Sequence, residues 1–147
     1  MEDRRLIRAA LQARERAYSP YSHFQVGAAL LAEDGRIFTG CNIENAAYSV
    51  TNCAERTAFF KAVSEGVYDF QGIAIVGGAG GQEPSGLCPP CGVCRQVMME
   101  FCIPDRFRIL LGRSEEDYQV FTLAQLLPMG FGPDDLAKAA AAESVHL

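Results

Sequence analysis

The stretch Thr51-Asn52-Cys53-Ala54-Glu55-Arg56, read together with Pro90-Cys91-Gly92-Val93-Cys94, is the one around which this chain is organised. The first segment supplies one thiol and, two residues later, a carboxylate. The second supplies two thiols at the C-x-x-C spacing that is typical of zinc sites. Three sulfur ligands are one fewer than a closed structural zinc site takes, and an open position for water is typical of catalytic zinc. The sequence therefore predicts a Zn²⁺ site of Cys53, Cys91 and Cys94, with Glu55 moving the protons of the water.

Length and composition indicate a single domain over residues 1–147, with the 49% hydrophobic content of an ordinary soluble globular protein. The formal net charge of −5 argues against a nucleic-acid partner, whose binding surface would be basic. No apolar run approaches the roughly 18 residues of a membrane span. The first residues, Met1-Glu2-Asp3-Arg4-Arg5, lack the apolar core of a secretory signal. We therefore expect a cytoplasmic protein whose six cysteines are reduced rather than paired in disulfides.

Hydrophobic periodicity predicts a helix over residues 3–17, which Pro20 ends. The segments Phe24–Leu31 and Arg36–Ile43 read as strands, and the turn signal Glu33-Asp34-Gly35 joins them into an antiparallel hairpin. The remaining predicted elements are a helix over Cys53–Ser64 closed by Gly66, a strand over Gly72–Val76, a glycine-rich loop over 77–86, a helix over Cys91–Phe101, and strands over Phe107–Leu111 and Tyr118–Thr122.

These elements predict an α/β fold of three layers, α/β/α, around a mixed five-stranded sheet. The strands at 72–76 and 107–111 flank a helix in a right-handed βαβ unit, so they should be parallel. The connection to the last strand is only about six residues, too short for a crossover, so the last two strands should be antiparallel. The alanine-rich segment from about residue 134 is expected to be a short helix or a frayed tail.

Both metal-binding segments open predicted helices, whose N-terminal partial positive charge favours thiolate over thiol. Three thiolates on Zn²⁺ leave a formal charge of −1, which weakens the metal as a Lewis acid. Arg56 is the side chain best placed to offset this charge, and we expect it to donate hydrogen bonds to one or two of the cysteine sulfurs. The alternative is a surface arginine on a helix.

Two features of these segments have structural alternatives. Asn52 as N-cap with Glu55 at the third helical position has the form of a capping box. In that case Glu55 would only cap the helix and would have no catalytic role. Cys88 adds a fourth thiol near the metal; if it filled the open position, the site would be a closed Cys₄ site in a zinc-stabilised binding module. Cys41 and Cys102 are most simply small buried hydrophobic residues.

The pattern Cys53-x-Glu55 followed by Pro90-Cys91-x-x-Cys94 resembles the signature of the zinc-dependent cytidine deaminase superfamily. The resemblance extends over roughly residues 5–131. Further stretches that resemble the small, free-nucleoside members are Tyr18–Ser22, Phe24–Ala29, Asn42–Asn45 and Cys91–Gln96. The resemblance implies a cytidine deaminase of pyrimidine salvage, with one Zn²⁺ per subunit, that converts cytidine and 2′-deoxycytidine to uridine and 2′-deoxyuridine plus ammonia.

The resemblance also implies roles for single residues. Zinc-bound hydroxide would attack C4 of the cytosine ring, with Glu55 as proton shuttle and backbone N–H groups near Ala54 or Cys91 holding the attacking oxygen. Asn42 and Glu44 would bind a ribose hydroxyl, although such a pair alone could be a solvated strand end. The aromatic residues implied to contact substrate are Phe24, Phe131 (which the family lends to a neighbouring subunit's pocket) and, more weakly, Tyr48.

The small members are homotetramers with shared sites, so the resemblance implies the same assembly here. Two other enzyme classes share the metal motifs: nucleic-acid-editing deaminases, which the acidic charge disfavours, and deaminases of blasticidin-type antibiotics, which the Asn42/Glu44 pair and Phe131 disfavour. Cytidine and deoxycytidine offer the same 3′ hydroxyl, so the sequence does not separate them.

Overall fold

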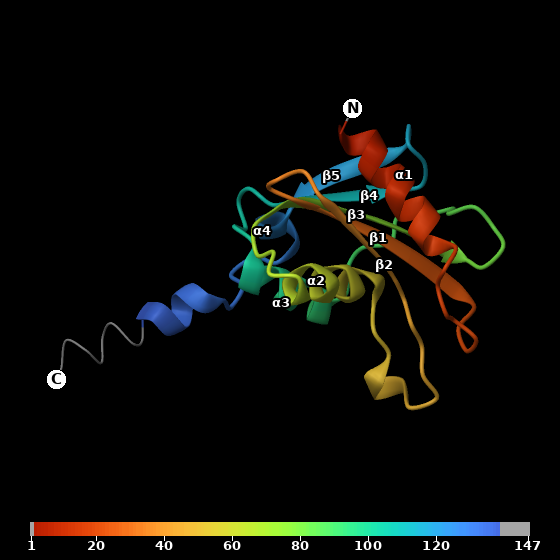
Figure 1. Ribbon diagram of the computed structural model, residues 1–147, viewed down its shortest axis with the longest axis horizontal. Coiled ribbons are helices and arrows are strands. Elements are labelled where there is room, and N and C mark those ends of the chain that lie inside the picture. Colours follow the sequence, from red (N-terminus) through yellow and green to blue (C-terminus); the bar gives the residue numbers. More distant parts are fainter. Residues whose placement is uncertain (1, 139–147) are drawn as a thin grey trace.

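A computed structural model describes residues 2–138 and shows a five-stranded sheet with helices on both faces (Figure 1). The helices are α1 (Glu2–Arg14), α2 (Ala54–Ser64), α3 (Gly92–Phe101) and α4 (Leu123–Leu126), with a 3₁₀ turn at Tyr48–Val50. The strands are β1 (Phe24–Ala32), β2 (Ile37–Cys41), β3 (Phe70–Ala79), β4 (Arg108–Gly112) and β5 (Tyr118–Thr122). Residues 133–138 are also helical, which agrees with the first of the two alternatives for the alanine-rich segment, a short helix; the later residues of that segment lie outside the described range.

The strand order is β2-β1-β3-β4-β5. Only the β3/β4 pair is parallel; β1 pairs antiparallel with both β2 and β3, and β5 pairs antiparallel with β4. The predicted mixed five-stranded sheet is thus confirmed, together with its first hairpin, its parallel pair and its antiparallel final pair. In the part of the chain that the structure describes, no helix combines the length and apolar character needed to cross a bilayer.

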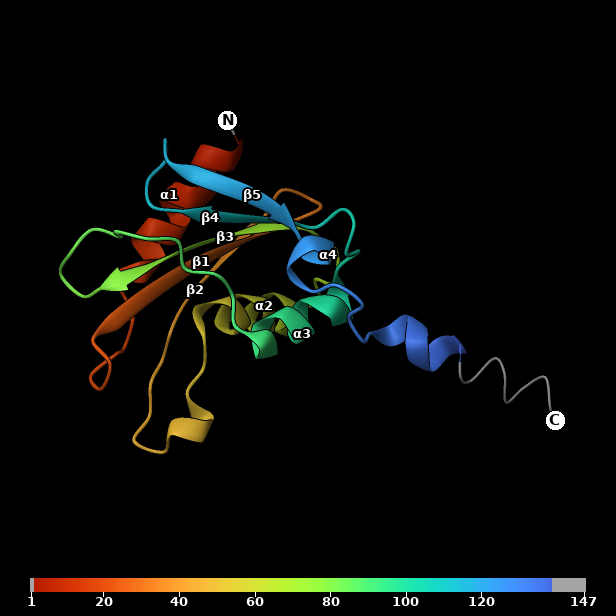
Figure 2. The same cartoon turned by 180° about the vertical axis from the view of Figure 1, so that it is seen from behind.

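Two hydrophobic clusters make the three layers. Leu6, Ile7 and Ala10 of α1 pack on one face of the sheet, and Ala58 and Phe59 of α2, with Met98 of α3, pack on the other (Figures 1 and 2). The alternation of β1 follows this division, because Ala28 and Leu30 face α2 and α3, with Val26 beside them, while Ala29 and Leu31 face α1. The predicted shared face of Val26, Ala28 and Leu30 is confirmed.

Glycines let both helical layers approach the sheet closely. A Cβ on Gly27 of β1 would lie 2.0 Å from the backbone oxygen of Ala10 in α1. A Cβ on Gly40 of β2 would lie 2.4 Å from the backbone oxygen of Ala54, the first residue of α2. Real Cβ atoms do not come so near, so only glycine fits at these positions. The N-terminal turn of α2, where the metal motif lies, is therefore seated directly on β2.

Two predicted boundaries are wrong for tertiary reasons. The first helix ends at Arg14 rather than residue 17, because the chain turns there and the Tyr18 N–H donates to the Asn42 carbonyl at 2.9 Å. Strand β3 continues through Gly77 and Gly78, which were expected in a loop, because β1 pairs with it as far as Ala79. Both contacts are with residues far away in the chain, so the local sequence pattern does not predict them.

Candidate metal centre and active site

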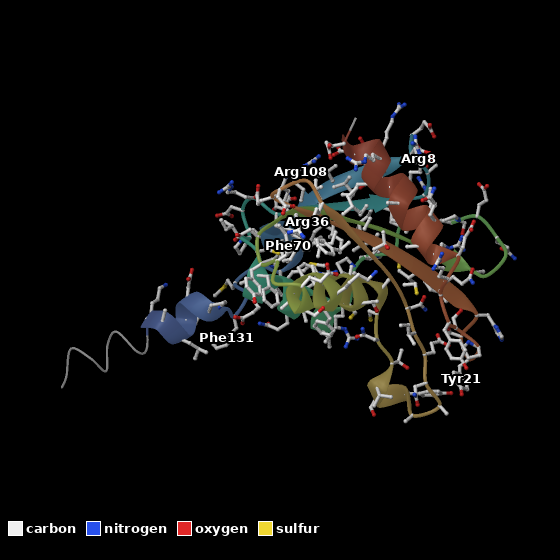
Figure 3. The ribbon with its side chains drawn as sticks, viewed as in Figure 1. Arg8, Tyr21, Arg36, Phe70, Arg108 and Phe131 are labelled. Carbon is white, nitrogen blue, oxygen red and sulfur yellow. The ribbon has the colours of Figure 1, made fainter. Side chains whose placement is uncertain are left out.

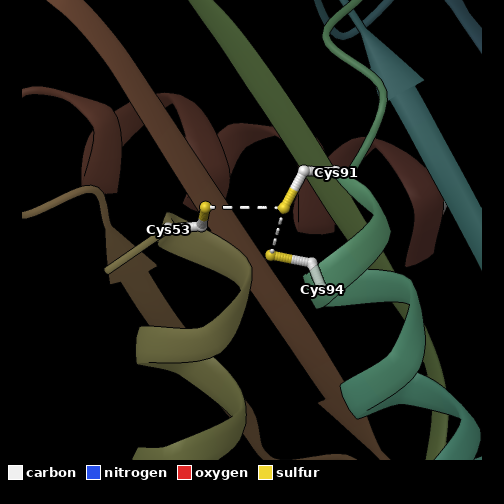
Figure 4. A group of neighbouring side chains, drawn as sticks. All are labelled: Cys53, Cys91 and Cys94. Carbon is white, nitrogen blue, oxygen red and sulfur yellow. Dashed lines mark hydrogen bonds between the residues drawn. The ribbon is translucent and has the colours of Figure 1, made fainter. Parts of the chain in front are cut away.

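Three cysteine sulfurs meet between the N-termini of α2 and α3 (Figure 4). Cys53 is the N-cap of α2, Cys91 is the N-cap of α3, and Cys94 is the third residue of α3. The Sγ of Cys91 lies 3.8 Å from that of Cys53 and 3.5 Å from that of Cys94. All three lie within 4.8 Å of one another. Segments 38 residues apart in the chain thus bring together the three thiols that the sequence singled out.

The surroundings of this cluster favour negative charge on sulfur. Neither N-cap cysteine uses its side chain to cap its helix, so both thiols are free to bind an ion at the positive ends of two helix dipoles. The hydrogen bond with Cys94, assisted by the Arg56 guanidinium, lowers the pKa of the Cys53 thiol to about 5. The pKa of Cys94 is raised, first by that same hydrogen bond and then by burial. Of this pair, Cys53 therefore ionises first.

Arg56 lies one turn from Cys53, and its Nη2 donates a hydrogen bond to the Cys53 Sγ at 3.2 Å. The contact expected from the sequence is therefore present. Burial lowers the pKa of Arg56, but its hydrogen bonds to Cys53 and Cys94 outweigh burial and raise that pKa overall. The Nε atom is buried and has no hydrogen-bond partner among the described residues. The guanidinium thus directs its bonding toward the thiols.

Glu55 is the second residue of α2 and is only 5% exposed. Burial, followed by the charge of Cys53, raises the pKa of its carboxyl to about 7. A carboxyl with this pKa can both accept and donate a proton near neutral pH. The capping-box alternative is wrong, because the N-cap is Cys53 rather than Asn52 and makes no side-chain capping bond.

Cys88 is not a member of the three-thiol group, although it is among the described residues. Its sulfur packs against Gly77 of β3, where an added Cβ would lie 2.8 Å from the sulfur and 3.1 Å from the ring of Phe24. Burial raises the pKa of this thiol to about 11. The closed four-cysteine site is therefore not formed. Cys41 and Cys102 are partly buried, and burial raises the pKa of each.

The polar pair Asn42 and Glu44 lies just beyond β2, on the loop that leads to α2. Asn42 is buried, and its amide accepts from the Val26 N–H at 2.9 Å and donates to the Phe24 carbonyl at 2.8 Å. It thereby extends the pairing of β1 and fixes Phe24 at the start of that strand. Glu44 accepts from the backbone N–H of Tyr21 at 3.0 Å and of Ser22 at 3.1 Å, and also from the Ser22 hydroxyl.

Glu44 also lines a hollow of ≈ 380 Å³ whose other lining residues are Tyr21, Ser22, Tyr48 and Thr51. Tyr48 is 74% exposed, and its ring meets that of Tyr21 edge-on with centroids 6.0 Å apart. The donors that hold Glu44 were missed from the sequence, because Tyr21 and Ser22 precede it by 23 and 22 residues. The sequence pointed to these two residues only through the Tyr18–Ser22 stretch, which resembles the small members of the family.

Phe131 lies apart from Tyr21 and is not among the residues that line the hollow beside Glu44. It is 59% exposed and begins the arm that leaves the body of the molecule, whereas Tyr21 lies toward the opposite end (Figure 3). Within one chain, the structure therefore joins the three cysteines, Glu55 and Arg56 in one cluster, and Glu44 and Tyr48 line one hollow.

The donor set of the cluster suits zinc. Three thiolate-forming sulfurs within 4.8 Å of one another are soft ligands of the kind Zn²⁺ prefers, and a helix dipole and an arginine offset their charge. The number of protein ligands leaves a fourth position for water or substrate. The arrangement fits a catalytic zinc site of Cys53, Cys91 and Cys94.

Comparison with known proteins agrees with this geometry. The profile described as "Cytidine and deoxycytidylate deaminase zinc-binding region" matches residues 1–109. The cytidine deaminase of Sporosarcina psychrophila is 53% identical over 140 residues, which cover 95% of this chain and 98% of that protein. The cytidine deaminase of Mycobacterium tuberculosis H37Rv is 42% identical, covering 88% and 89%. The crystal structure of cytidine deaminase from Burkholderia pseudomallei superposes with a TM-score of 0.78 at 48% identity, covering 86% and 97%.

Proposed function

Because the chain belongs to the cytidine and deoxycytidylate deaminase family and is a zinc-dependent enzyme, we propose a specific reaction for it. It hydrolyses cytidine and 2′-deoxycytidine to uridine and 2′-deoxyuridine with release of ammonia. One observation carries the proposal. The buried carboxyl of Glu55 lies two residues from the Cys53 thiol, at the end of α2 where the three sulfurs meet. A proton-transfer group beside an open metal position suits hydrolysis better than a structural role.

In this proposal, Cys53, Cys91 and Cys94 hold the Zn²⁺, which when bound supplies a Lewis acid that makes water nucleophilic near neutral pH. Glu55 takes a proton from the attacking water and delivers it to N3 of the cytosine ring. It then takes the remaining proton from the oxygen now bonded to C4 and gives it to the amino nitrogen, so that the C4–N bond breaks, ammonia leaves and a C4 carbonyl remains. A carboxyl whose pKa burial raises to about 7 is suited to alternate between base and acid in this way.

The remaining residues orient the nucleoside. Glu44, held by the N–H groups of Tyr21 and Ser22, keeps a fixed carboxylate that can accept a ribose hydroxyl. Asn42 would join it, and its bonds to β1 set the position of the Phe24 ring, which we propose packs against the base or sugar. Tyr48 borders the same hollow. The backbone N–H of Ala54, in the first turn of α2, is a candidate donor to the attacking oxygen.

We also propose that subunits assemble into a homotetramer and that Phe131 of one subunit completes the pocket of another. The exposure of Phe131 and its position toward the end of the molecule opposite Tyr21 support this, because from there its ring is open to a neighbouring subunit and does not reach the hollow beside Glu44 of its own chain (Figure 3). A place in pyrimidine salvage, acting on free nucleosides rather than nucleic acid, agrees with the net charge of −5. A cytoplasmic location agrees with thiol ligands, which need a reducing compartment.

The test is the variant Glu55→Gln, which keeps the size of the side chain and removes its acid–base chemistry. We expect zinc content equal to that of the wild type and a fall in kcat of at least about 10²–10⁴-fold, the range for loss of a general acid–base. The matched control is Glu65→Gln, an exposed glutamate at the other end of α2. Release of ammonia from cytidine, deoxycytidine and blasticidin, with and without a chelator, measures both activity and substrate class. Activity retained by Glu55→Gln would overturn the assignment.

A further inference from the structure

Arg95 of α3 joins two parts of the molecule that the proposed mechanism treats separately. Its Nε donates to the backbone oxygen of Pro90 at 2.8 Å, and its Nη1 donates to the backbone oxygen of Leu126. Pro90 directly precedes the Cys91 ligand, and Leu126 ends α4. Beyond Leu126 lie residues 127–132, here termed the C-terminal segment, which includes Phe131. One guanidinium therefore bonds both to the entry of the metal motif and to the root of this segment.

The bond to Pro90 bears directly on the Cys91 ligand. Pro90 is fully buried, so its carbonyl needs a partner inside the protein, and Arg95 supplies one. Because a peptide unit is planar, fixing the Pro90 oxygen also fixes the amide of Cys91. That residue is the N-cap of α3 with φ −69° and ψ 168°, and its side-chain direction follows from this backbone. The Arg95 bond thus restrains the thiol of Cys91.

The C-terminal segment lies along the same helix at further points. The Nε2 of Gln96 donates to the Phe131 carbonyl at 2.8 Å. Gly130 and Gly132 pack on the side chain of Met99, where Cβ atoms would lie 3.2 Å from its sulfur and 3.1 Å from its methyl group. The segment is therefore docked on α3, and Arg95 is the contact that links this docking to the metal motif.

We propose that Arg95 is a positioning residue that couples zinc retention to the docking of the C-terminal segment. An ordered metal centre holds the Pro90 peptide, which fixes Arg95 in the orientation that binds the Leu126 carbonyl. By thermodynamic reciprocity, docking of the segment stabilises the metal centre to the same extent. Arginine is required because its planar fork presents separate donors in two directions, whereas a lysine ammonium would serve one carbonyl as a point charge. For its effect on turnover the inference rests on the role proposed for Phe131.

The experiment compares full-length wild type with Arg95→Met, Arg95→Lys and Gln96→Ala. The first measurement is the rate at which zinc passes from the loaded protein to a chromogenic chelator. We expect both Arg95 variants to release zinc about 10-fold faster, the low end of the range for residues that support a metal ligand indirectly. Gln96→Ala weakens docking of the same segment but leaves the bond to Pro90 in place, so by reciprocity it should also release zinc faster than the wild type, but by a smaller factor than the Arg95 variants.

The second measurement is amide hydrogen exchange of residues 127–132 with and without zinc, with the amides of β3 as an internal reference. In the wild type, removal of zinc should raise exchange in this segment about 10-fold, within the usual range of coupled sites, and leave β3 unchanged. In Arg95→Met the exchange should be fast in both states. A wild-type segment indifferent to zinc, or Arg95 variants that retain zinc as the wild type does, would overturn the proposal. Both readouts are independent of deamination, so failure of the proposed function would show separately as an inactive wild type.

Discussion

Arg56 is the residue on which the charge of the metal centre depends most directly. Three thiolates and one Zn²⁺ carry a formal charge of −1, and an excess of negative charge reduces the power of the metal to polarise water. The hydrogen bond from Arg56 Nη2 to the Cys53 Sγ places a cation against one of these sulfurs. The two helix N-termini act in the same direction. The protein thus offsets the charge of an all-cysteine site with one side chain and two backbone dipoles.

Removal of this cation tests its role. We expect Arg56→Gln to lower zinc affinity about 10-fold, as loss of a residue bonded to a metal ligand commonly does, and to lower kcat as well. Arg56→Lys keeps the charge but not the geometry, so it should fall between the wild type and Arg56→Gln. Competition with a chelator of known affinity measures the first effect and nucleoside deamination the second. Zinc affinity and kcat that do not change in Arg56→Gln would show that the hydrogen bond has no part in the metal centre.

Residues whose partners are near in the chain could be read from the sequence. The spacing of Cys53 and Glu55, and of Cys91 and Cys94, places each pair in one helical turn. The fold then only has to bring the N-termini of the two helices together to form the site. The partners of Glu44 and Arg95 could not be found in this way. Glu44 bonds to Ser22, and Arg95 to Leu126, which lie 22 and 31 residues away, and the pattern around each residue gives no sign of these bonds.

At the scale of elements, the position of α2 on β2 determines where Cys53 and Glu55 lie. Gly40 lets the first turn of α2 touch the strand, and Thr57 fastens the two by donating to the Cys41 carbonyl at 3.0 Å. Lys61 further along α2 donates to the Thr39 carbonyl. These bonds also occupy outward-facing carbonyls of β2, an edge strand of the sheet. The helix is therefore held at its first turn and again one turn later.

The substitution Gly40→Ala should disturb the contact between β2 and the first turn of α2. A Cβ at this position would lie 2.4 Å from the Ala54 oxygen and 2.6 Å from the Ala58 nitrogen, so α2 must shift. The entropic benefit of alanine over glycine, at most about 1 kcal/mol, is outweighed by about 1–3 kcal/mol of overpacking. We expect a lower free energy of unfolding and weaker zinc binding, measured by denaturant titration and chelator competition.

The matched control for this substitution is Gly86→Ala, since a Cβ at Gly86 meets nothing within 4 Å. It should leave both the free energy of unfolding and zinc affinity within experimental error of the wild type. If Gly40→Ala behaved in the same way, α2 would not be seated by its contact with Gly40.

The order of the elements followed from the sequence more reliably than their ends. Connection lengths settled which strands pair in parallel, because a short link such as that between β4 and β5 allows only a hairpin. The ends depended on contacts from elsewhere: α1 stops where Tyr18 pairs with the chain beyond β2, and β3 runs on because β1 lies beside it. The N-cap of α2 shifted to Cys53, because Asn52 pairs with Ile43 instead of capping the helix.

At the scale of the whole molecule, exposed aromatic and apolar side chains at two separated places bear on the proposed assembly. Tyr21 and Tyr48 border the hollow beside Glu44 at one place, and Phe131 and the fully exposed Met129 lie at the other. Tyr21 and Phe131 lie toward opposite ends of the molecule (Figure 3). An assembly in which one end of a subunit meets the other end of its neighbour would cover both and would complete each site with a partner's residue.

Complementation between two defective variants tests this sharing. Glu55→Gln lacks the proton-transfer group, and Phe131→Ala lacks the proposed contact with a neighbouring pocket and should raise KM. When the two are co-expressed and co-purified, some sites should combine Glu55 of one subunit with Phe131 of the other. We expect these sites to show a KM near that of the wild type.

Two observations would contradict the shared site. One is a mixture whose activity equals the sum of its separate parts at every substrate concentration. The other is a protein that stays monomeric by light scattering at the concentrations assayed.

The measurement that tests the central claim most directly is anomalous diffraction at the zinc absorption edge from crystals of the purified protein. The account predicts one anomalous peak per chain, at about 2.3 Å from the Sγ atoms of Cys53, Cys91 and Cys94, with the fourth position open toward the carboxyl of Glu55. A peak whose fourth ligand is the sulfur of Cys88 or another protein atom, or the absence of any peak between the N-termini of α2 and α3, would contradict it.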